Sequence, residues 1–382
     1  MDFGWSEDQI EFVDDVVRFA ETLPNDTIIA RDASSEFAFD VWQCCADFGL
    51  IGMNVPKEFG GTGRADILSS MHAMQAMGRI YNDVGLLFAL NAHMWTVQLP
   101  ILRFGTEAQK QKFLPPMCRG EWIGAHAVTE PNTGSDVFNL ETTARKCEGG
   151  YILNGTKRLV SLAPIAHVAL VFATVDASKG RWGVTAFLVK KESAGYRVSD
   201  NMPKMGLRTV PWGEVYLEDC FVPEANLLGS EGGGFALSQH SLEYERCCIL
   251  ASQVGAMERQ LDAAIKFARS RKQFGQPIGK FQSVSNRIAD MKMRIETAKL
   301  LLYKVAWLKQ QERSAMLEAA LLKLYLSECY VDSSFDAIRI HGGRAYLTEE
   351  GIERDLRDAI GGVLYAGTSD IQRNIVAKLL GL

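Results

Sequence analysis

The chain has 382 residues and a formal net charge of −5, from 41 Lys and Arg against 46 Asp and Glu. Hydrophobic residues make up 47% of it and charged residues 23%, which indicates a folded protein of about two or three domains and excludes a mainly disordered chain. The mildly acidic balance argues against a general nucleic-acid-binding protein, although it leaves room for a local basic patch.

No uninterrupted apolar run approaches the roughly 18 residues of a membrane span. The acidic start of the chain lacks the basic region that opens a secretory signal. The eight cysteines include no CxxC pair, and no spacing joins the six histidines into a metal site. We therefore expect a cytoplasmic protein with free thiols, no bound metal, and no contact with a membrane or a nucleic acid.

Residues 1–120 have the periodicity of helices. Ser6 is a candidate N-cap, and apolar residues then recur at intervals of three or four, as at Ile10, Val13 and Val17. Glycine-containing breaks divide the region into about four or five helices. This segment is predicted to be an N-terminal α-helical domain.

Residues 121–232 are predicted to form a middle antiparallel β-barrel or sandwich domain. Tyr151–Leu153 is a candidate strand, and the Asn154-Gly155 pair that follows is typical of a hairpin turn because both residues accept a positive φ. Further runs of β-branched and aromatic residues predict strands at 168–175, 183–190 and 214–217.

Helical periodicity returns in residues 233–382. A seam with the 3, 4, 3, 4, 3 spacing of a long bundle helix is formed by Ile288, Met291, Ile295, Ala298, Leu302 and Val305. Such a seam more often packs inside one chain than between subunits. The sequence therefore predicts an α+β fold in three parts, which ends in a C-terminal four-helix bundle domain.

A run rich in hydroxyl groups, from His126 to Asp136, joins the helical region to the first strand. The hydroxyls of Thr129 and Ser135 and the accessible backbone at Gly134 could bind the edge of a ligand. Taken alone, the run is also compatible with an ordinary turn.

The TEPNTGSD part of this run resembles the flavin-contacting signature of the acyl-CoA dehydrogenase superfamily. Three more motifs similar to those of that family follow in order, at Arg271–Gly275 with Gln282, at Ile340–Gly343 and at Leu364–Gln372. The helix, β, helix order matches over essentially the whole chain, which makes chance agreement improbable.

The resemblance implies a non-covalent FAD between the β domain and the C-terminal helices, with Arg271 and Gln282 reaching it from a neighbouring subunit. The residues implied to line the isoalloxazine are His126, Val128, Thr129, Gly134, Ser135, Leu159, Val160 and Ser161. Those implied to complete the cofactor site are Arg271, Phe274, Gln282, Arg339, Gly342, Gly343, Thr368 and Asp370. The guanidinium at 271 suits a diphosphate because its planar donors match phosphate oxygens.

One departure from the family pattern concerns the flavin's surroundings. The family commonly has an aromatic residue beside the flavin, in a stretch where this chain has Leu159. The change alters the shape and polarity expected there. Ser161 keeps a hydroxyl that could hydrogen-bond the N5 region of the flavin.

A second departure concerns the catalytic base. Many members place a Glu directly before the GTS of the last motif, where this chain has Ala366. The chain resembles isovaleryl-CoA dehydrogenase, which also has Ala there and carries its base directly before an Arg on another helix. Glu245 is thereby implied to remove the α-proton of an acyl thioester while hydride passes to flavin N5. The residues implied to bind the substrate are Ser135, Glu243, Arg246, Ala366 and Gly367.

Helix geometry separates the two glutamates of this segment. Residues two positions apart diverge by about 200°, so Glu243 and Glu245 cannot both face the flavin. The competing interpretation is that both are solvated helix charges.

Three stretches, Gly85–His93, Leu207–Val215 and Met257–Leu261, resemble dehydrogenases that act on a prolyl or similar aminoacyl group. In those enzymes the group is carried by the phosphopantetheine arm of an acyl or peptidyl carrier protein in natural-product biosynthesis. The alternatives are a short branched-chain acyl-CoA dehydrogenase and a redox-silent thioester-binding protein. The resemblance also implies a homotetramer, and an electron acceptor such as an electron-transfer flavoprotein or oxygen.

Several basic residues could form a rim that meets CoA phosphates or an acidic helix of a carrier protein. They are Lys204, Arg208, Lys266, Arg269 and Lys280. Ordinary surface charge is the alternative explanation.

Overall fold

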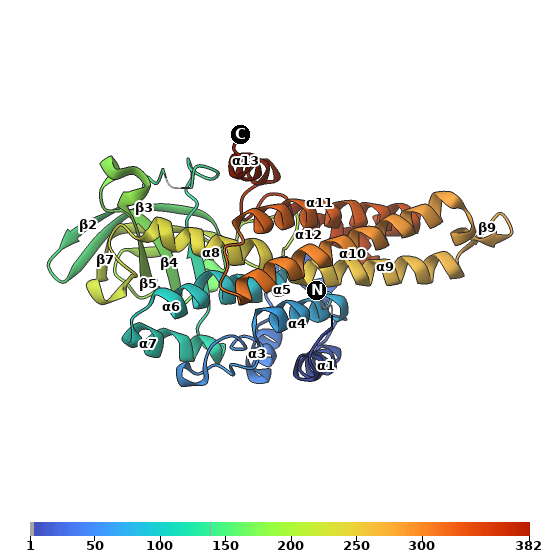
Figure 1. The fold of residues 1–382 in the computed structure, drawn as a ribbon, viewed down its shortest axis with the longest axis horizontal. Coiled ribbons are helices and arrows are strands. Elements are labelled where there is room, and N and C mark those ends of the chain that lie inside the picture. Colours follow the sequence, from blue (N-terminus) through green and yellow to red (C-terminus); the bar gives the residue numbers. More distant parts are fainter. Residues whose placement is uncertain (1–3, 138) are drawn as a thin grey trace.

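The computed structural model describes residues 4–137 and 139–382. Figure 1 shows the middle β-sheet at one end of the long axis and the helical bundle extending to the other, with the N-terminal helices packed below. The predicted α+β order of helices, β domain and helices is confirmed. The proposed boundaries, 1–120, 121–232 and 233–382, fall in connections between these groups of elements.

The N-terminal helices begin at the predicted cap. Ser6 Oγ accepts from Gln9 N at 3.3 Å and Gln9 Oε1 accepts from Ser6 N at 3.1 Å, which is a capping box. The elements are α1 (Glu7–Glu21), α2 (Ile28–Ser34), α3 (Phe39–Phe48), α4 (Ile67–Ile80), α5 (Val84–Ala92), η2 (His93–Gln98), α6 (Leu99–Phe104) and α7 (Glu107–Cys118). The six-residue η2 is a π-helix, a rare form that often occurs at functional sites.

The continuous helical segment Val84–Phe104, formed by α5, η2 and α6, is long and apolar enough to cross a membrane. Every residue of its most apolar window is buried in the fold, so the segment serves as a core helix here. The sequence analysis did not recognise a segment of this length because polar residues such as Asn91 and His93 interrupt the apolar run. Inside the protein these side chains have partners: Asn91 bonds Leu87 O and Trp95, and His93 bonds Gly124 N.

The middle domain is one mixed sheet with the order β6-β7-β3-β2-β4-β5-β8, and β1 pairs with β4. Its strands are β1 (Gly124–Ala127), β2 (Thr143–Cys147), β3 (Gly150–Ser161), β4 (Val168–Thr174), β5 (Val184–Lys190), β6 (Tyr196–Val198), β7 (Trp212–Pro223) and β8 (Leu227–Leu228). Most pairings are antiparallel as predicted, but β1 and β2 each pair with β4 in parallel. The strands predicted at 168–175, 183–190 and 214–217 are confirmed as β4, β5 and part of β7.

The predicted hairpin turn at Asn154-Gly155 is wrong, because β3 continues through both residues. Here the register against β7 shifts, and Gly155 has a φ of +151°. A Cβ on Gly155 would lie 2.5 Å from Thr142 Oγ1, so the position needs glycine. Asn154 Oδ1 accepts from Asp219 N at 2.8 Å, which fixes the irregularity.

The C-terminal bundle confirms the predicted seam. Its elements are α8 (Gly234–Cys248), α9 (Ala251–Ser270), the hairpin of β9 (Lys272–Gln273) and β10 (Gln276–Pro277), α10 (Gln282–Gln310), α11 (Met316–His341), α12 (Ile352–Gly362) and α13 (Ser369–Leu379). Five of the six seam residues, from Met291 to Val305, are fully buried, and Ile288 packs against the same core. That core contains residues of all three parts of the chain, so the parts share one hydrophobic interior.

Candidate active site

The two segments proposed to line the flavin lie against each other at the end of the sheet. One follows β1 and the other is the end of β3, and Arg158 N donates to Thr129 O at 2.8 Å between them. Val128 and Val160 are buried, whereas Gly134 and Ser135 are exposed. The residues of these two segments are therefore brought together as the sequence analysis expects.

Leu159 lies on a β-bulge near the end of β3. It has a φ of +57°, and the register against β7 shifts between Lys157 and Val160. The bulge turns the Leu159 side chain outward, and it is 50% exposed. Ser161 follows, paired with Trp212 of β7. An apolar surface and a hydroxyl thus lie beside each other where the resemblance expects a flavin ring.

The π-helix η2 connects this region to α8, since it contacts both β1 and α8. Gly124 N donates to His93 Nδ1 at 3.0 Å, and Trp95 stacks on Tyr244 at 6.2 Å between ring centroids. Burial lowers the pKa of His93 to about 3, so the ring is neutral and acts as an acceptor. The residue following Tyr244 is Glu245, so η2 links β1 to the helix that carries the proposed base.

Glu245 is not a solvated helix charge. Burial raises its pKa to about 7, while the charges of Arg246 and Lys323 oppose that rise. Lys323 on α11 has no exposed surface, and among the described residues its Nζ has no hydrogen-bond partner. A carboxylate of this pKa is suited to take up a proton near neutral pH.

Glu243 is bound by a lysine and a backbone amide. Its Oε2 accepts from Lys309 Nζ at 2.6 Å and from the backbone N–H of Ala315 at 3.3 Å. Arg246 is buried, and its Nε lacks a hydrogen-bond partner within the described part of the chain. The interpretation of both glutamates as solvated charges is therefore wrong, and the contacts of Glu243 and Arg246 with substrate stay predictions.

The last motif forms a tight turn before α13. Ala366 and Gly367 both have positive φ, and Gln372 Nε2 donates to their carbonyl oxygens at 2.9 and 3.1 Å. Thr368 Oγ1 accepts from Ile371 N at 3.2 Å and caps the helix. Asp370 is exposed and pairs with Arg373 at 3.2 Å, so a contact with cofactor would have to replace or share this pair.

Tyr365 connects this turn to the base. It packs 4.9 Å from the ring of Phe88, and its hydroxyl bonds Gln253 Nε2. Burial raises the pKa of Tyr365, and the charge of Glu245 contributes to that rise, so the two side chains are within electrostatic reach. The sequence analysis assigned no role to Tyr365 or Lys323. No spacing in the sequence places either near Glu245, because α11 and the turn after α12 meet α8 only through the fold.

The remaining cofactor residues lie at the other end of the molecule. Figure 1 shows the β9 hairpin, which lies between Arg271 and Gln282, at the far end of the bundle from the sheet. Phe274 is 93% exposed there. The ring of His341 stacks on Phe267 at 4.6 Å, which places Arg339, Gly342 and Gly343 near the same end. A single chain therefore does not bring the two sets together.

The residues of the proposed basic rim come from several parts of the chain. Arg208 Nε donates to Lys204 O at 3.0 Å in the connection between β6 and β7. Lys266 and Arg269 instead lie on the last turns of α9, and Lys280 follows the β9 hairpin. These residues belong to separate elements of one chain, and the basic rim stays a prediction.

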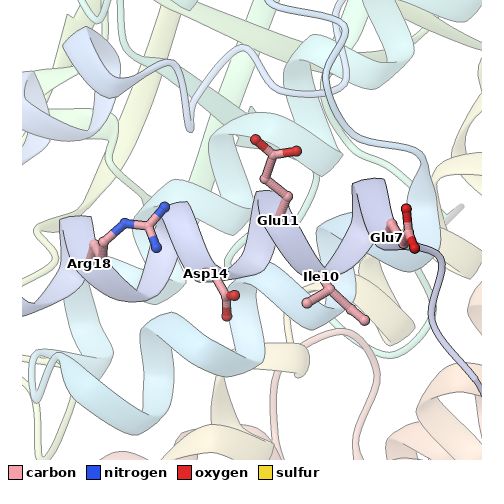
Figure 2. Close-up of a pocket in the computed structure, with 5 residues that line it drawn as sticks. All are labelled: Glu7, Ile10, Glu11, Asp14 and Arg18. Atoms are coloured by element: carbon pink, nitrogen blue, oxygen red, sulfur yellow. The ribbon is translucent and has the colours of Figure 1, made fainter.

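Two hollows in the surface of the described residues lie away from the proposed site. Five side chains of one helix, α1, line the pocket in Figure 2: Glu7, Ile10, Glu11, Asp14 and Arg18. A cavity of about 270 Å³ lies where α9 meets the start of α12 and includes Arg259, Arg354 and His341. Neither contains Glu245. Within residues 4–137 and 139–382, no group of three His, Cys, Asp or Glu could hold a metal ion.

The residues near the end of β3 fit a flavin ring. Two buried polar atoms in this region have no hydrogen-bond partner in the described structure, His126 Nε2 and Trp212 Nε1. Burial and the charge of Lys157 lower the pKa of His126 to about 4, so its ring is neutral. Exposed backbone at Gly134 and the hydroxyls of Ser135 and Ser161 add further donors and acceptors, which matches the mixed polar edge of an isoalloxazine.

Comparison with known proteins agrees with this architecture. Three family models match the chain: the N-terminal domain of acyl-CoA dehydrogenase at residues 6–121, the middle domain at 125–220 and the C-terminal domain at 232–381. The chain belongs to the acyl-CoA dehydrogenase family, whose members are FAD-dependent oxidoreductases.

Several individual proteins are similar to this chain over essentially its full length. An L-prolyl-[peptidyl-carrier protein] dehydrogenase of Pseudomonas fluorescens is 43% identical, with all of both chains covered. The crystal structure of the prolyl acyl carrier protein oxidase AnaB has a TM-score of 0.97 and 49% identity, and the match covers 99% of this chain and 100% of AnaB. PigA, solved with FAD and proline, has a TM-score of 0.97 and 38% identity with full coverage of both chains.

Proposed function

We propose that this protein is an FAD-dependent dehydrogenase of a small aminoacyl thioester, a prolyl-type group carried by the phosphopantetheine arm of a carrier protein. The observation that carries the proposal is the partly buried Glu245 on α8, whose pKa is raised to about 7 in a chain with Ala366 at the alternative base position. The full-length likeness to a prolyl carrier-protein dehydrogenase supports the substrate class.

FAD would be held by the segment from His126 to Ser135 and by Leu159, Val160 and Ser161. When bound, it supplies the acceptor for the two electrons removed from the substrate. The protein contributes a neutral His126, a dry wall at Val128 and Val160, and hydroxyls at the end of β3. These groups orient a polar ring and exclude water from one side of it.

Glu245 removes the α-proton of the thioester. A carboxylate with a pKa near 7 is partly ionised at neutral pH and is basic enough to accept a proton from a weak carbon acid. The buried cations Arg246 and Lys323 stabilise the carboxylate before the proton transfer and keep part of it ionised. Ser135, Ala366 and Gly367 are proposed to line the acyl group and its arm.

A short branched-chain acyl-CoA dehydrogenase is the second candidate, because the Glu245 and Ala366 arrangement suits its substrate equally well. Both substrates share the phosphopantetheine arm. The discriminating experiment presents the purified flavoprotein with a prolyl carrier protein and with isovaleryl-CoA, and follows the loss of oxidised flavin absorbance. Bleaching by isovaleryl-CoA with none by any aminoacyl carrier protein would sink the first proposal.

The electron acceptor is proposed to be an electron-transfer flavoprotein or oxygen. Measuring peroxide release against reduction of an electron-transfer flavoprotein separates the two. A location in the cytoplasm stays a prediction.

We propose a homotetramer as the working assembly. The outer face of α10 carries a stripe of exposed apolar residues seven positions apart, Met293, Leu300 and Trp307, at 64, 55 and 46% exposure. The separation of Arg271 and Gln282 from the flavin-lining segments also supports a neighbouring subunit that completes the site.

A further inference from the structure

A buried ion pair joins the two segments that the proposed function assigns to the flavin. Lys157 Nζ lies 2.7 Å from Glu130 Oε1, and the two side chains are 0% and 1% exposed. The same ammonium donates to Val128 O at 3.1 Å. Lys157 belongs to β3, while Val128 and Glu130 follow β1. The Lys157 side chain therefore links β3 to two residues of the segment after β1.

Glu130 also closes the loop that carries Gly134 and Ser135. Its Oε2 accepts from Glu141 N at 2.6 Å and from Thr133 Oγ1 at 3.3 Å. Its Oε1 accepts from Thr142 N at 2.9 Å. The Glu130 carboxylate, at the beginning of the loop, thus accepts hydrogen bonds from two backbone amides at its far end, those of Glu141 and Thr142.

The strand pairing alone does not hold these segments together. β1 pairs with β4, whereas β3 pairs with β2 and β7, so the ladders place no bond between β1 and β3. Among the described residues, the hydrogen bonds between these two segments are the Arg158–Thr129 backbone bond and the bonds of Lys157. Lys157 is also the last paired residue before the bulge at Leu159.

The energetics argue against a purely stabilising role. Removing two charges from water costs several kcal/mol per ion, and a buried ion pair is often no more stable than an apolar pair of the same size. Burial lowers the pKa of Lys157 to about 8 although Glu130 opposes the change, so the desolvation cost of the lysine is not fully offset. Burial opposes ionisation of Glu130 as well, whereas Lys157 and the hydrogen bonds of Glu130 keep the pKa of that carboxyl below its usual value. The pair does supply five directional bonds at fixed places in two segments.

We propose that Lys157 and Glu130 are positioning residues that set the relative placement of the 126–135 segment and the end of β3, and thereby the affinity for FAD. The inference rests on the proposed flavin-lining segments. Neither residue is proposed to touch the flavin ring. They act through the backbone at Val128 and Thr129, through the loop at Gly134, and through the bulge at Leu159.

The test compares Lys157→Met, Glu130→Gln and the double variant with the natural protein. Each single change leaves one buried group without its partner, so both should lower the melting temperature of the FAD-free protein. The double variant removes both charges, and its melting temperature should recover in part. Its dissociation constant for FAD, measured by flavin fluorescence, should nevertheless stay about tenfold or more above that of the natural protein, because the bonds of Lys157 are missing and a glutamine at position 130 keeps only one of the two acceptor oxygens of Glu130.

Hydrogen exchange supplies a second readout, which needs no bound cofactor. Amides of residues 129–137 and 139–142 should exchange faster in the double variant than in the natural protein, while those of β4 and β5 should be unchanged. Lys146→Met, at an exposed lysine on β2, is the matched control and should leave FAD affinity unchanged. If the double variant does not fold, Glu130→Gln alone must weaken FAD binding and speed exchange at 133–137 and 139–142.

Two results would overturn the inference. Recovery of FAD affinity together with melting temperature in the double variant would mean that the pair is only structural. Unaltered FAD affinity in every variant, with weaker binding in Ser161→Ala, would overturn the positioning role and leave the proposed site intact. Failure of the natural protein to bind FAD would instead overturn the proposed function and this inference together.

Discussion

Glu243 and Lys309 form an ion pair with an N–O distance of 2.6 Å, in which the side chains are 10% and 9% exposed. The pair fixes Glu243 to the end of α10 and to the backbone N–H of Ala315. Glu245, two residues later, points to a different side of α8 and has a raised pKa. The two glutamates of one short motif thus have different surroundings, and Glu245 is the proposed base.

Replacing Glu245 by Gln should remove the base without emptying the flavin site. We expect purified Glu245→Gln to stay yellow and to be reduced by substrate at least about 100-fold more slowly than the natural protein, the scale of a lost general base. Rapid-mixing absorbance at the flavin band measures this rate. Glu21→Gln, at an exposed position of α1, is the control. Unchanged reduction in Glu245→Gln would favour a redox-silent protein or another base.

The sequence was sufficient for features that depend on neighbours along the chain. The N-cap at Ser6 and the α10 seam follow from local spacing, and both are found as predicted. The prediction of a hairpin turn at Asn154-Gly155 was wrong because the same two residue types also suit a β-bulge. Only the pairing of β3 with β7 distinguishes a turn from a bulge. Local pattern cannot supply that information.

The same limit explains what was missed in the site. Glu130 and Lys157 are 27 positions apart, and Glu243 and Lys309 are 66 apart. A lysine in a strand or at a helix end is usually solvated, and nothing in its neighbours indicates a buried partner. The family motifs predicted where the flavin and the base lie, whereas the buried ion pairs near those residues became visible only in the fold.

Lys323 should lower the pKa of the proposed base, Glu245. Its positive charge lowers the pKa of Glu245, so Lys323→Met is expected to raise that pKa above its present value of about 7. The carboxylate is the active form, so flavin reduction should rise with pH and level off above the pKa, with about a tenfold loss per pH unit below it. In Lys323→Met the whole profile should move to higher pH. Rates measured from pH 5 to 9 test this, with Lys292→Met, an exposed lysine of α10, as control. If the pH profile of Lys323→Met is not shifted, Lys323 does not influence the pKa of Glu245.

Arg271 should serve the flavin of a neighbouring subunit. Arg271→Ala is expected to weaken FAD binding about 10-fold or more, and Arg271→Lys less, since lysine keeps the charge but not the planar pair of donors. Co-expression of Arg271→Ala with Glu245→Gln chains offers a sharper test. A mixed assembly contains sites with an intact Glu245 and an intact Arg271 from the adjacent chain, so activity should return. No recovery in verified mixed assemblies would place Arg271 in the site of its own chain.

The α10 stripe should be a subunit contact. Leu300→Glu puts a charge at the centre of the row formed by Met293, Leu300 and Trp307, and burying that charge without a partner is costly. We expect light scattering after gel filtration to show dissociation into smaller species. Ile29→Glu, at an apolar residue of α2 that is 41% exposed, is the matched control. An unchanged mass for Leu300→Glu would show that this face of α10 does not join subunits.

Asp358 should make stability fall as the pH rises. Its Oδ1 accepts from Leu207 N at 2.6 Å, which ties α12 to the connection before β7, and burial raises its pKa to about 7 although this bond opposes the rise. The unfolded carboxyl loses its proton near pH 4, whereas the folded one keeps it to about pH 7. The folded state therefore binds more protons between these values, and the free energy of unfolding decreases across the interval.

Asp358→Asn keeps an oxygen that can accept from Leu207 but cannot ionise. Relative to the natural protein, the variant should gain melting temperature from pH 5 to about pH 7 and then level off, because between these values only the natural protein must take up a proton on folding. Asp262→Asn, at an exposed aspartate paired with Arg79, should show no such trend. Calorimetry at three pH values measures the difference. If the difference between variant and natural protein is the same at pH 5 and pH 8, Asp358 is already ionised in the folded state and burial does not control its proton.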